Sequence, residues 1–263
     1  MKELVIISGK GGAGKTSVTA AFAALAGKSV LVDCDVDAAD LHLLMRPDIH
    51  RRMPFCGGKE AIIRAEDCTG CGVCLEHCRF GAVRLESGAE GRPVCRVESV
   101  GCEGCGVCVA QCPSQAIDFP ERISGEWYVS STRFGPMVHA RLHPGGENSG
   151  KLVAQVREEA RAIGRKEGID LALIDGPPGI GCSVIASIAG ASQVVIVTEP
   201  TLAGRHDLQR VLDLARHFNL PTAVCINKWD INPALAEQIE REAQHHGAYL
   251  AGHIRYDRSI TDA

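Results

Sequence analysis

Eight of the thirteen cysteines form two runs with the same spacing, and this spacing is the strongest chemical signal in the sequence. Each run has the form Cys-x2-Cys-x2-Cys-x3-Cys, and the second repeats the first 34 residues later. Thiolates at this spacing hold three corners of a [4Fe–4S] cube, and the fourth cysteine of each run reaches the other cluster. The pattern predicts two clusters, one held by Cys68, Cys71, Cys74 and Cys112 and the other by Cys102, Cys105, Cys108 and Cys78.

Zinc is the alternative metal for a cysteine-rich segment, but it fits this spacing less well. Structural zinc sites usually draw their ligands from two separated Cys-x2-Cys pairs, whereas here four cysteines follow one another closely in each run. The first run ends in Cys78-Arg79 and the second in Cys112-Pro113, and the missing proline leaves the ligand count unchanged. Of the other cysteines, Cys34, Cys182 and Cys225 are expected to be core thiols, and the spacing assigns no role to Cys56 or Cys95.

A glycine-rich segment over residues 9–16, Gly-Lys-Gly-Gly-Ala-Gly-Lys-Thr, has the pattern of a phosphate-binding P-loop. It lies between an expected strand and an expected helix, so backbone N–H groups and the positive end of the helix would bind phosphates. Lys15 would reach the β- and γ-phosphates of ATP, and Thr16 would bind Mg²⁺. The candidate nucleotide-binding residues here are Gly11, Gly12, Ala13, Gly14, Lys15, Thr16 and Ser17.

Three aspartates follow expected strands and are candidates for the same site. Asp175 ends an apolar strand, where a water-mediated contact with Mg²⁺ is expected. Asp33 and Asp35 follow another strand, and the carboxyl ends of parallel strands are where ligands bind. Asp35 could orient the attacking water, or both residues could cap their loop. Lys10 is a second lysine within the P-loop, and it is either a surface lysine or a further phosphate contact.

Apolar runs alternate with segments of helical periodicity on both sides of the cysteine-rich stretch. This alternation predicts an α/β fold with a parallel sheet and helices on both faces, and the P-loop motif makes it one of the P-loop NTPase kind. The expected strands are 4–8, 29–32, 170–174, 193–198, 222–226 and 249–254, and the expected helices are 16–26, 152–165, 207–218 and 233–246. The duplicated cysteine unit interrupts this pattern. We therefore expect an inserted domain at 62–120, resembling a bacterial two-cluster ferredoxin, and a discontinuous ATPase domain over 1–61 and 121–263.

The composition excludes several classes of protein. The 263 residues are 45% hydrophobic and carry a net charge of −4, which favours a globular protein that does not bind nucleic acid. The longest apolar runs are about four residues, so membrane insertion is not expected. We expect a cytoplasmic protein, in which thiols stay reduced and dense cysteines bind metal rather than form disulfides.

These motifs together resemble a known family. Residues 10–16 resemble the deviant Walker A motif of the MinD/ParA/nitrogenase-iron-protein class of P-loop ATPases, which includes the Mrp-like proteins. Asp33-Cys34-Asp35 and residues 175–179 resemble its switch regions, and Asn227-Lys228 its adenine-reading turn. With the two cysteine runs, the chain resembles MinD-superfamily ATPases that contain an inserted ferredoxin domain.

The resemblance implies a role for several of these residues. Lys10 would contact phosphate across a nucleotide-sandwich dimer, and Asn227 would hydrogen-bond adenine. Asp35 would serve the attacking water, and Asp175 would serve Mg²⁺ and sense the γ-phosphate. The implied assembly is a homodimer or a heterodimer with a paralogue.

Three functions from different classes fit these observations. The first is an ATPase whose nucleotide state gates electron transfer through two [4Fe–4S] clusters to a redox or metalloprotein partner. The second is an ATPase for assembly or maturation of a metal or iron–sulfur centre, for which a few shared cysteines would be expected rather than eight in a ferredoxin pattern. The third is a positioning ATPase of the ParA kind, which the sequence disfavours because it lacks a basic DNA-binding face.

Overall fold

The computed structural model describes residues 1–146 and 148–262, and it divides the chain into two compact units. The larger unit comprises Met1–Met53, Glu126–Leu142 and the chain from Ser149 onward, and the smaller comprises Pro54–Gly125 with His143–Asn148. The expected insert, 62–120, lies within the smaller unit. In the described part of the chain, every helix is too short or too polar to cross a membrane.

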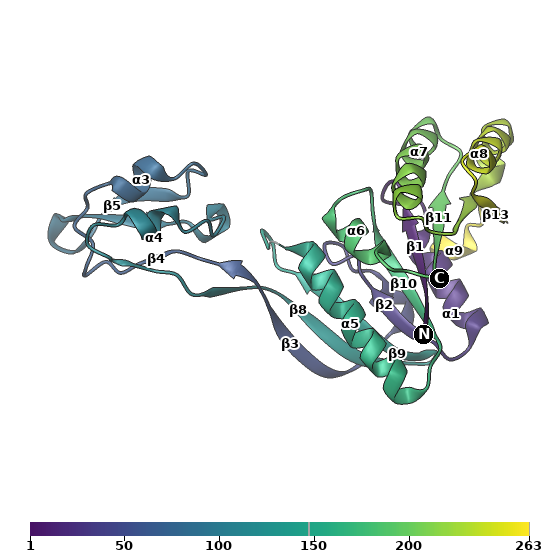
Figure 1. Cartoon of the computed structure of the whole chain (residues 1–263), viewed down its shortest axis with the longest axis horizontal. Coiled ribbons are helices and arrows are strands. Elements are labelled where there is room, and N and C mark those ends of the chain that lie inside the picture. The colour runs from purple at the N-terminus through teal and green to yellow at the C-terminus, as the bar shows by residue number, and fades with distance from the viewer. Residues whose placement is uncertain (147, 263) are drawn as a thin grey trace. The chain divides into compact units, whose positions relative to one another are not determined.

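The central sheet contains the six predicted strands and three more. Its strands are β1 (Lys2–Ser8), β2 (Val30–Asp33), β3 (Asp48–Lys59), β8 (Glu121–Thr132), β9 (Gly135–Leu142), β10 (Leu171–Pro178), β11 (Gln193–Thr198), β12 (Thr222–Asn227) and β13 (Tyr249–Ile254). Among the described residues their order is β13-β12-β11-β1-β10-β2-β9-β8-β3 (Figure 1). Every pair from β13 to β9 is parallel. The α/β fold with a mainly parallel sheet is confirmed.

The strands β3, β8 and β9 lie outside the predicted pattern. Only two residues, Arg133 and Phe134, join β8 to β9, so these neighbours form an antiparallel hairpin, and β3 pairs with β8 at the edge. The first seven residues of β3 are exposed. The predicted parallel sheet therefore continues into an antiparallel edge that was not predicted, because the exposed start of β3 lacks the continuous apolar run that marks a buried parallel strand.

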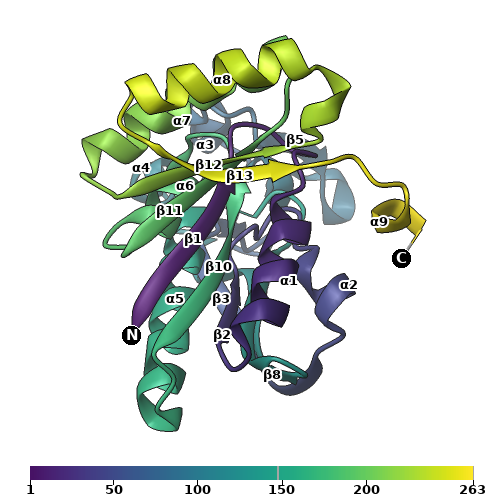
Figure 2. The same ribbon diagram turned by 90° about the vertical axis from the view of Figure 1, so that its right-hand side faces the viewer.

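Helices cover both faces of the sheet. These are α1 (Lys15–Ala26), α2 (Leu41–Met45), α5 (Ser149–Glu167), α6 (Cys182–Ile188), α7 (Leu202–His217) and α8 (Pro233–His245), with the short η3 (Trp229–Ile231) and α9 (Ser259–Asp262). Figure 2 shows α1 and α2 on one side of the strands and α7 and α8 on the other. The helix α7 begins at Leu202 rather than the predicted Asp207, because the Thr201 hydroxyl accepts a hydrogen bond from Gly204 N at 3.0 Å and caps it.

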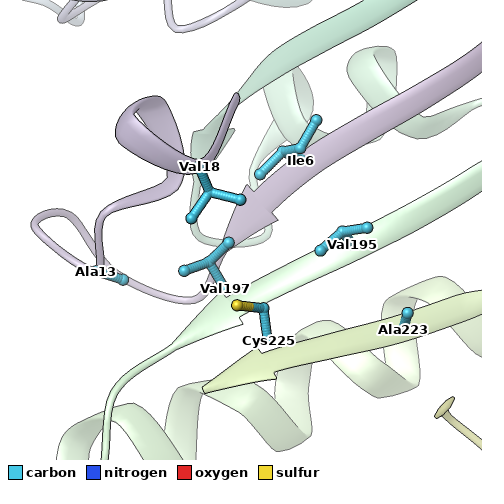
Figure 3. Packing of buried hydrophobic residues seen from close by; sticks show 7 residues of the cluster. All are labelled: Ile6, Ala13, Val18, Val195, Val197, Ala223 and Cys225. Carbon is cyan, nitrogen blue, oxygen red and sulfur yellow. The ribbon is translucent and has the colours of Figure 1, made fainter. Parts of the chain in front are cut away.

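A cluster of apolar side chains anchors the P-loop to the sheet. Ile6 of β1 and Val197 of β11 pack with Val18 of α1, and Ala13 of the loop joins them with only 2% of its surface exposed (Figure 3). Burial of apolar surface on both sides of the loop stabilises its position at the carboxyl end of β1. The core therefore determines where phosphates can bind.

The smaller unit is built from short elements around buried sulfur. It contains β4 (Ile62–Ile63), β5 (Val83–Ser87), β6 (Pro93–Val97) and β7 (Ile117–Asp118), with α3 (Val73–His77), α4 (Val107–Gln111), η1 (Ala89–Gly91) and η2 (Ser99–Gly101). The pairs β4–β7 and β5–β6 are antiparallel. Cys68, Cys74 and Cys95 are buried in its core beside Val83 and Ile117. Cysteine side chains thus make up much of the core of this unit, where a larger domain would have apolar side chains.

A buried ion pair joins α5 to β1 and α6, and breaking it is expected to destabilise the larger unit. Arg157 is 4% exposed, pairs with Glu3, and donates to Ala186 O at 2.6 Å and Ala189 O at 2.9 Å. Burial raises the pKa of Glu3, but Arg161 and Arg157 outweigh burial and lower it. The change Arg157→Met should lower the free energy of unfolding by about 3–5 kcal/mol, because it leaves a buried carboxylate short of a partner.

Urea denaturation of the two variants Arg157→Met and Arg161→Met measures this effect. Arg161 pairs with the same carboxylate, but its side chain is 40% exposed, so its loss should cost clearly less. If the two variants lost the same free energy of unfolding, the burial of Arg157 would not be the reason for its larger expected effect.

Candidate functional site

The P-loop connects β1 to α1 through glycines that other residues could not replace without strain. Gly12 and Gly14 have φ angles of 81° and 91°, in the left-handed region. A Cβ atom at Gly14 would lie 2.3 Å from Asn227 Nδ2, and one at Gly9 would lie 2.5 Å from Asp207 Cβ. The glycines therefore permit both the turn and the close approach of the β12 end to the loop.

Lys15, Asp35 and Asp175 form a buried charged group where β1, β2 and β10 end. Lys15 Nζ lies 2.7 Å from Asp35 Oδ2 and 3.9 Å from Asp175 Oδ2. Burial lowers the pKa of Lys15, but the carboxylates of Asp175 and Asp35 outweigh burial and raise it. The lysine is therefore a cation, and a phosphate bound here would replace a carboxylate as its partner.

Two threonines of α1 hold Asp175. Thr16 Oγ1 donates to Asp175 Oδ2 at 2.7 Å, and Thr19 Oγ1 donates to Asp175 Oδ1 at 3.0 Å. The structure thus brings together Thr16 and Asp175, whose oxygens are of the kind that Mg²⁺ prefers. Thr19 was not among the predicted residues. Its spacing of three residues from Thr16, which places both on one helix face, is the signal that could have identified it.

Asp33 is fully buried and orders the segment that carries Asp35. Its Oδ1 accepts from Asp35 N at 3.1 Å and its Oδ2 accepts from Leu41 N at 3.2 Å. Burial, together with the charge of Asp175, raises the pKa of Asp33 well above its usual value. Of the two roles considered for Asp33, the geometry supports the loop cap.

His139 lies beside Asp33 in the sheet and is expected to make stability depend on pH. The residue is 6% exposed, its Nε2 lies 3.0 Å from Ser130 Oγ, and its ring stacks on Tyr128. Burial, with the nearby His42, lowers the pKa of His139 to about 4. Below about pH 6.5 this histidine therefore takes up a proton in the unfolded chain but stays neutral in the folded chain. The free energy of unfolding should fall by at most about 3 kcal/mol as the pH drops from 6.5 to 4.

Urea unfolding at several pH values checks this expectation with the variant His139→Gln. The variant should lose stability less steeply than the parent between pH 6.5 and 4. His50→Gln is the matched control, since His50 is exposed. A slope in His139→Gln equal to that of the parent would contradict the assignment.

Lys10 is held by an ion pair within its own chain. Its Nζ lies 2.5 Å from Glu199 Oε1, and Lys228 Nζ lies 3.4 Å from Glu199 Oε2. Burial raises the pKa of Glu199, but Lys10 and Lys228 outweigh burial and lower it. With a third of its side chain exposed, Lys10 could reach outward only if it left Glu199.

A cavity of about 340 Å³ adjoins the P-loop on the β12 and β13 side. Asn227 lies at its wall, where its Nδ2 donates to Ala13 O at 3.0 Å and its Oδ1 accepts from Lys228 N at 3.0 Å. The predicted residues Gly12, Gly14, Ser17 and Asn227 line it, together with Val18, Ala21, Lys228, Ile254, Arg255, Tyr256, Asp257 and Ile260. The segment after β13 was not predicted to contribute, because its residues form no local motif.

The eight predicted cluster ligands gather at two cavities of the smaller unit. Cys68, Cys71, Cys74 and Cys112 line the first, and Cys102, Cys105, Cys108 and Cys78 line the second. Each run thus supplies three cysteines to one cavity and its fourth to the other. This is the crossed grouping that the spacing predicts.

The other lining residues of the two cavities also correspond to one another. Ile63, Ala116 and Ile117 line the first cavity, and Val97, Ala82 and Val83, each 34 positions away in the sequence, line the second. Gly72 and Gly106, with φ angles of 76° and 74°, precede α3 and α4 in the same way. The repeat in the sequence is therefore a repeat in three dimensions.

The remaining cysteines are distributed over both units. Cys34 and Cys225 are buried, and burial raises the pKa of the Cys225 thiol to about 11, whereas Cys182 is exposed and is not the expected core thiol. Cys56 is half-buried. Cys95 lines the first cavity as a fifth thiol. In the described part of the chain, no three His, Cys, Asp or Glu side chains converge closely enough to hold a single metal ion.

Comparison with known proteins identifies the family. The CobQ/CobB/MinD/ParA nucleotide binding domain matches residues 4–263. The chain is 33% identical over 238 residues to the uncharacterized protein MJ0578 of Methanocaldococcus jannaschii, covering 88% of this chain and 79% of that protein.

Two solved structures are similar in fold. One is the septum site-determining protein MinD of Pyrococcus horikoshii complexed with Mg-ADP, with 16% identity and a TM-score of 0.56 over 99% of this chain and 84% of that chain. The other is a Cyanothece McdA variant complexed with ATP, with 16% identity and a TM-score of 0.55 over 100% and 86%. The chain described here belongs to the CobQ/CobB/MinD/ParA family of nucleotide-binding domains.

Proposed function

We propose that this chain is an ATP-hydrolysing iron–sulfur protein in which the nucleotide state gates electron transfer through two [4Fe–4S] clusters to a partner protein. The observation that carries the proposal is the pair of equivalent cavities, each lined by four of the predicted ligand thiols, in a chain that also contains a P-loop. A nucleotide-binding domain alone would need neither cavity.

The P-loop region supplies the groups that ATP hydrolysis requires. Lys15 would bind the phosphates, Thr16 and Asp175 would hold Mg²⁺, and Asp35 would orient the attacking water. The adenine would lie in the cavity beside Asn227. The Mg-ADP complex of the Pyrococcus horikoshii protein and the ATP complex of the Cyanothece protein support nucleotide binding by this fold.

The number and arrangement of the thiols support the proposal of [4Fe–4S] clusters rather than single ions. In a [4Fe–4S] cluster each iron takes one thiolate, so four ligands surround a space instead of converging on one point. The first cavity would hold its cluster through Cys68, Cys71, Cys74 and Cys112, and the second through Cys102, Cys105, Cys108 and Cys78. Such a cluster stores one electron at a time. We propose that residues 62–120 form a ferredoxin-like insert for this purpose, within an ATPase domain formed by 1–61 and 121–263.

The proposed working form is a dimer, either of identical chains or with a paralogue. ATP bound between two chains would release Lys10 from Glu199 and place it against phosphate, and hydrolysis would reverse this change. A redox protein or metalloprotein would receive the electron. Partner binding by this fold is supported by the MinC:MinD complex of Aquifex aeolicus, to which the chain has a TM-score of 0.53 at 18% identity, over all of this chain and 84% of that one.

Anaerobic purification followed by iron analysis and EPR tests the proposal. The chain should contain about eight irons, and the reduction potentials should shift when Mg·ATP is added. A chain without iron would contradict the cluster assignment. Full clusters whose reduction potentials do not change with nucleotide would contradict gating. They would favour the alternative function, an ATPase for the assembly or maturation of a metal centre.

A further inference from the structure

One of the buried positions at which the two cysteine cavities differ carries a thiol in the first cavity and none in the second. Gly70 in the first cysteine loop approaches Pro93 of β6, where an added Cβ would lie 2.4 Å from the Pro93 carbonyl oxygen. Gly104 in the second loop approaches Lys59 O at the same distance, and Lys59 precedes Pro93 by the 34 residues of the repeat. Each loop therefore packs against an equivalent stretch of backbone.

Two residues beyond each of these contacts, a buried residue of the chain lines the cavity. In the first cavity this residue is Cys95, and in the second it is Ala61; both are 2% exposed. Cys95 lines the first cavity together with Cys74, one of the four expected ligands, and both are buried in the core of the smaller unit. The methyl group of Ala61 has no proton to donate. The repeat thus brings a fifth thiol to one cavity and an inert group to the other.

We propose that Cys95 makes the two clusters inequivalent: its thiol donates a hydrogen bond to Cys74 Sγ, so the cluster in the first cavity is reduced at a higher potential than the cluster in the second. The inference rests on the proposed function. Cys74 as a ligand is a thiolate without a proton, so Cys95 must then be the donor. Hydrogen bonds to ligand sulfur stabilise the reduced cluster, which carries more negative charge.

A second pair of residues acts in the same direction. Cys112 Sγ in the first cavity accepts from Ala116 N at 3.4 Å and lies 3.6 Å from Ser114 Oγ. The residue equivalent to Ser114 in the second cavity is Phe80, which has no hydroxyl. The ligand sulfurs of the first cavity therefore have more hydrogen-bond donors near them than the ligand sulfurs of the second cavity.

The charged side chains next to Cys78 and Cys102 in the second cavity are exposed or paired. Glu103 and Arg79, both exposed, lie beside ligands of the second cavity with opposite charges, so their effects offset one another and are screened by solvent. Arg122 Nη1 lies 3.5 Å from Cys102 O, but the guanidinium group of Arg122 also forms an ion pair with Glu60, with Nε 3.9 Å from Glu60 Oε2. The buried difference between Cys95 and Ala61 is the one that solvent does not weaken.

The test is a redox titration of the anaerobically purified chain with dithionite and mediators, followed by EPR. The parent should show two reduction waves. The change Cys95→Ala should move the upper wave towards lower potential and leave the other in place, whereas Cys95→Ser, which keeps a donor, should retain most of the difference. The reverse change, Ala61→Cys, should raise the lower wave. All variants should keep about eight irons.

The outcomes separate this inference from the proposed function. Two waves that Cys95→Ala leaves unmoved, or a single wave in the parent, would overturn the inference while leaving the clusters in place. A loss of iron in Cys95→Ala would make Cys95 a ligand and would also overturn it. Absence of iron in the parent would overturn both. Potentials that respond to Cys95→Ala but not to Mg·ATP would contradict gating alone.

Discussion

The variant Lys10→Ala should lose more than about 100-fold in ATP hydrolysis while both clusters remain intact. If Lys10 contacts phosphate across a dimer, it neutralises charge that develops during phosphoryl transfer, and removal of one such group commonly costs two to three powers of ten. The residue lies outside the smaller unit that contains the cysteines, so iron content should not change. Steady-state phosphate release, together with iron analysis of the same sample, measures both quantities.

The ion pair with Glu199 provides the control for this variant. Lys10→Ala removes the lysine and also deprives Glu199 of one partner, and only the first change concerns hydrolysis. Glu199→Gln removes the ion pair and keeps the lysine, so it should retain hydrolysis. If Lys10→Ala hydrolyses ATP at the parental rate, Lys10 does not act on phosphate. If the two variants lose activity equally, the ion pair rather than the lysine is what hydrolysis needs.

Pairs of cysteine substitutions should show that each run gives its last cysteine to the other cluster. The double variant Cys71→Ala/Cys112→Ala removes two ligands from the first cavity and none from the second. It should lose one cluster and keep about four irons with an unaltered EPR signal from the other cluster. Cys71→Ala/Cys78→Ala takes one ligand from each cavity, so both clusters should be damaged.

The alternative, in which each run wraps its own cluster, reverses these results. Cys71 and Cys78 would then serve the same cluster, and their joint removal would leave the other one whole. Iron and sulfide analysis after anaerobic reconstitution distinguishes the two groupings, because both variants lack the same number of cysteines. Loss of both clusters in Cys71→Ala/Cys112→Ala and of only one in Cys71→Ala/Cys78→Ala would contradict the crossed grouping.

Local sequence was sufficient wherever neighbouring residues make the structure. The apolar runs around Ile6, Ile174 and Ile196 are long enough and buried enough to predict parallel strands, and they form the centre of the sheet. The edge strand β3 and its neighbour β8 pair with each other and contain no continuous buried run, and periodicity therefore does not reveal them.

For the nucleotide site, the sequence by itself determined the P-loop, because the glycine spacing from 9 to 14 dictates a backbone turn between β1 and α1. It also determined the cysteine runs, since four thiols within eleven residues must lie close together. The tertiary structure alone decided which distant groups meet: Thr19 with Asp175, Lys10 with Glu199, and Cys95 with Cys74 at one cavity. The physical reason is that these contacts depend on how the strands and helices pack against one another. Spacing along the sequence does not give the distance between two residues on elements that only the folded core brings together.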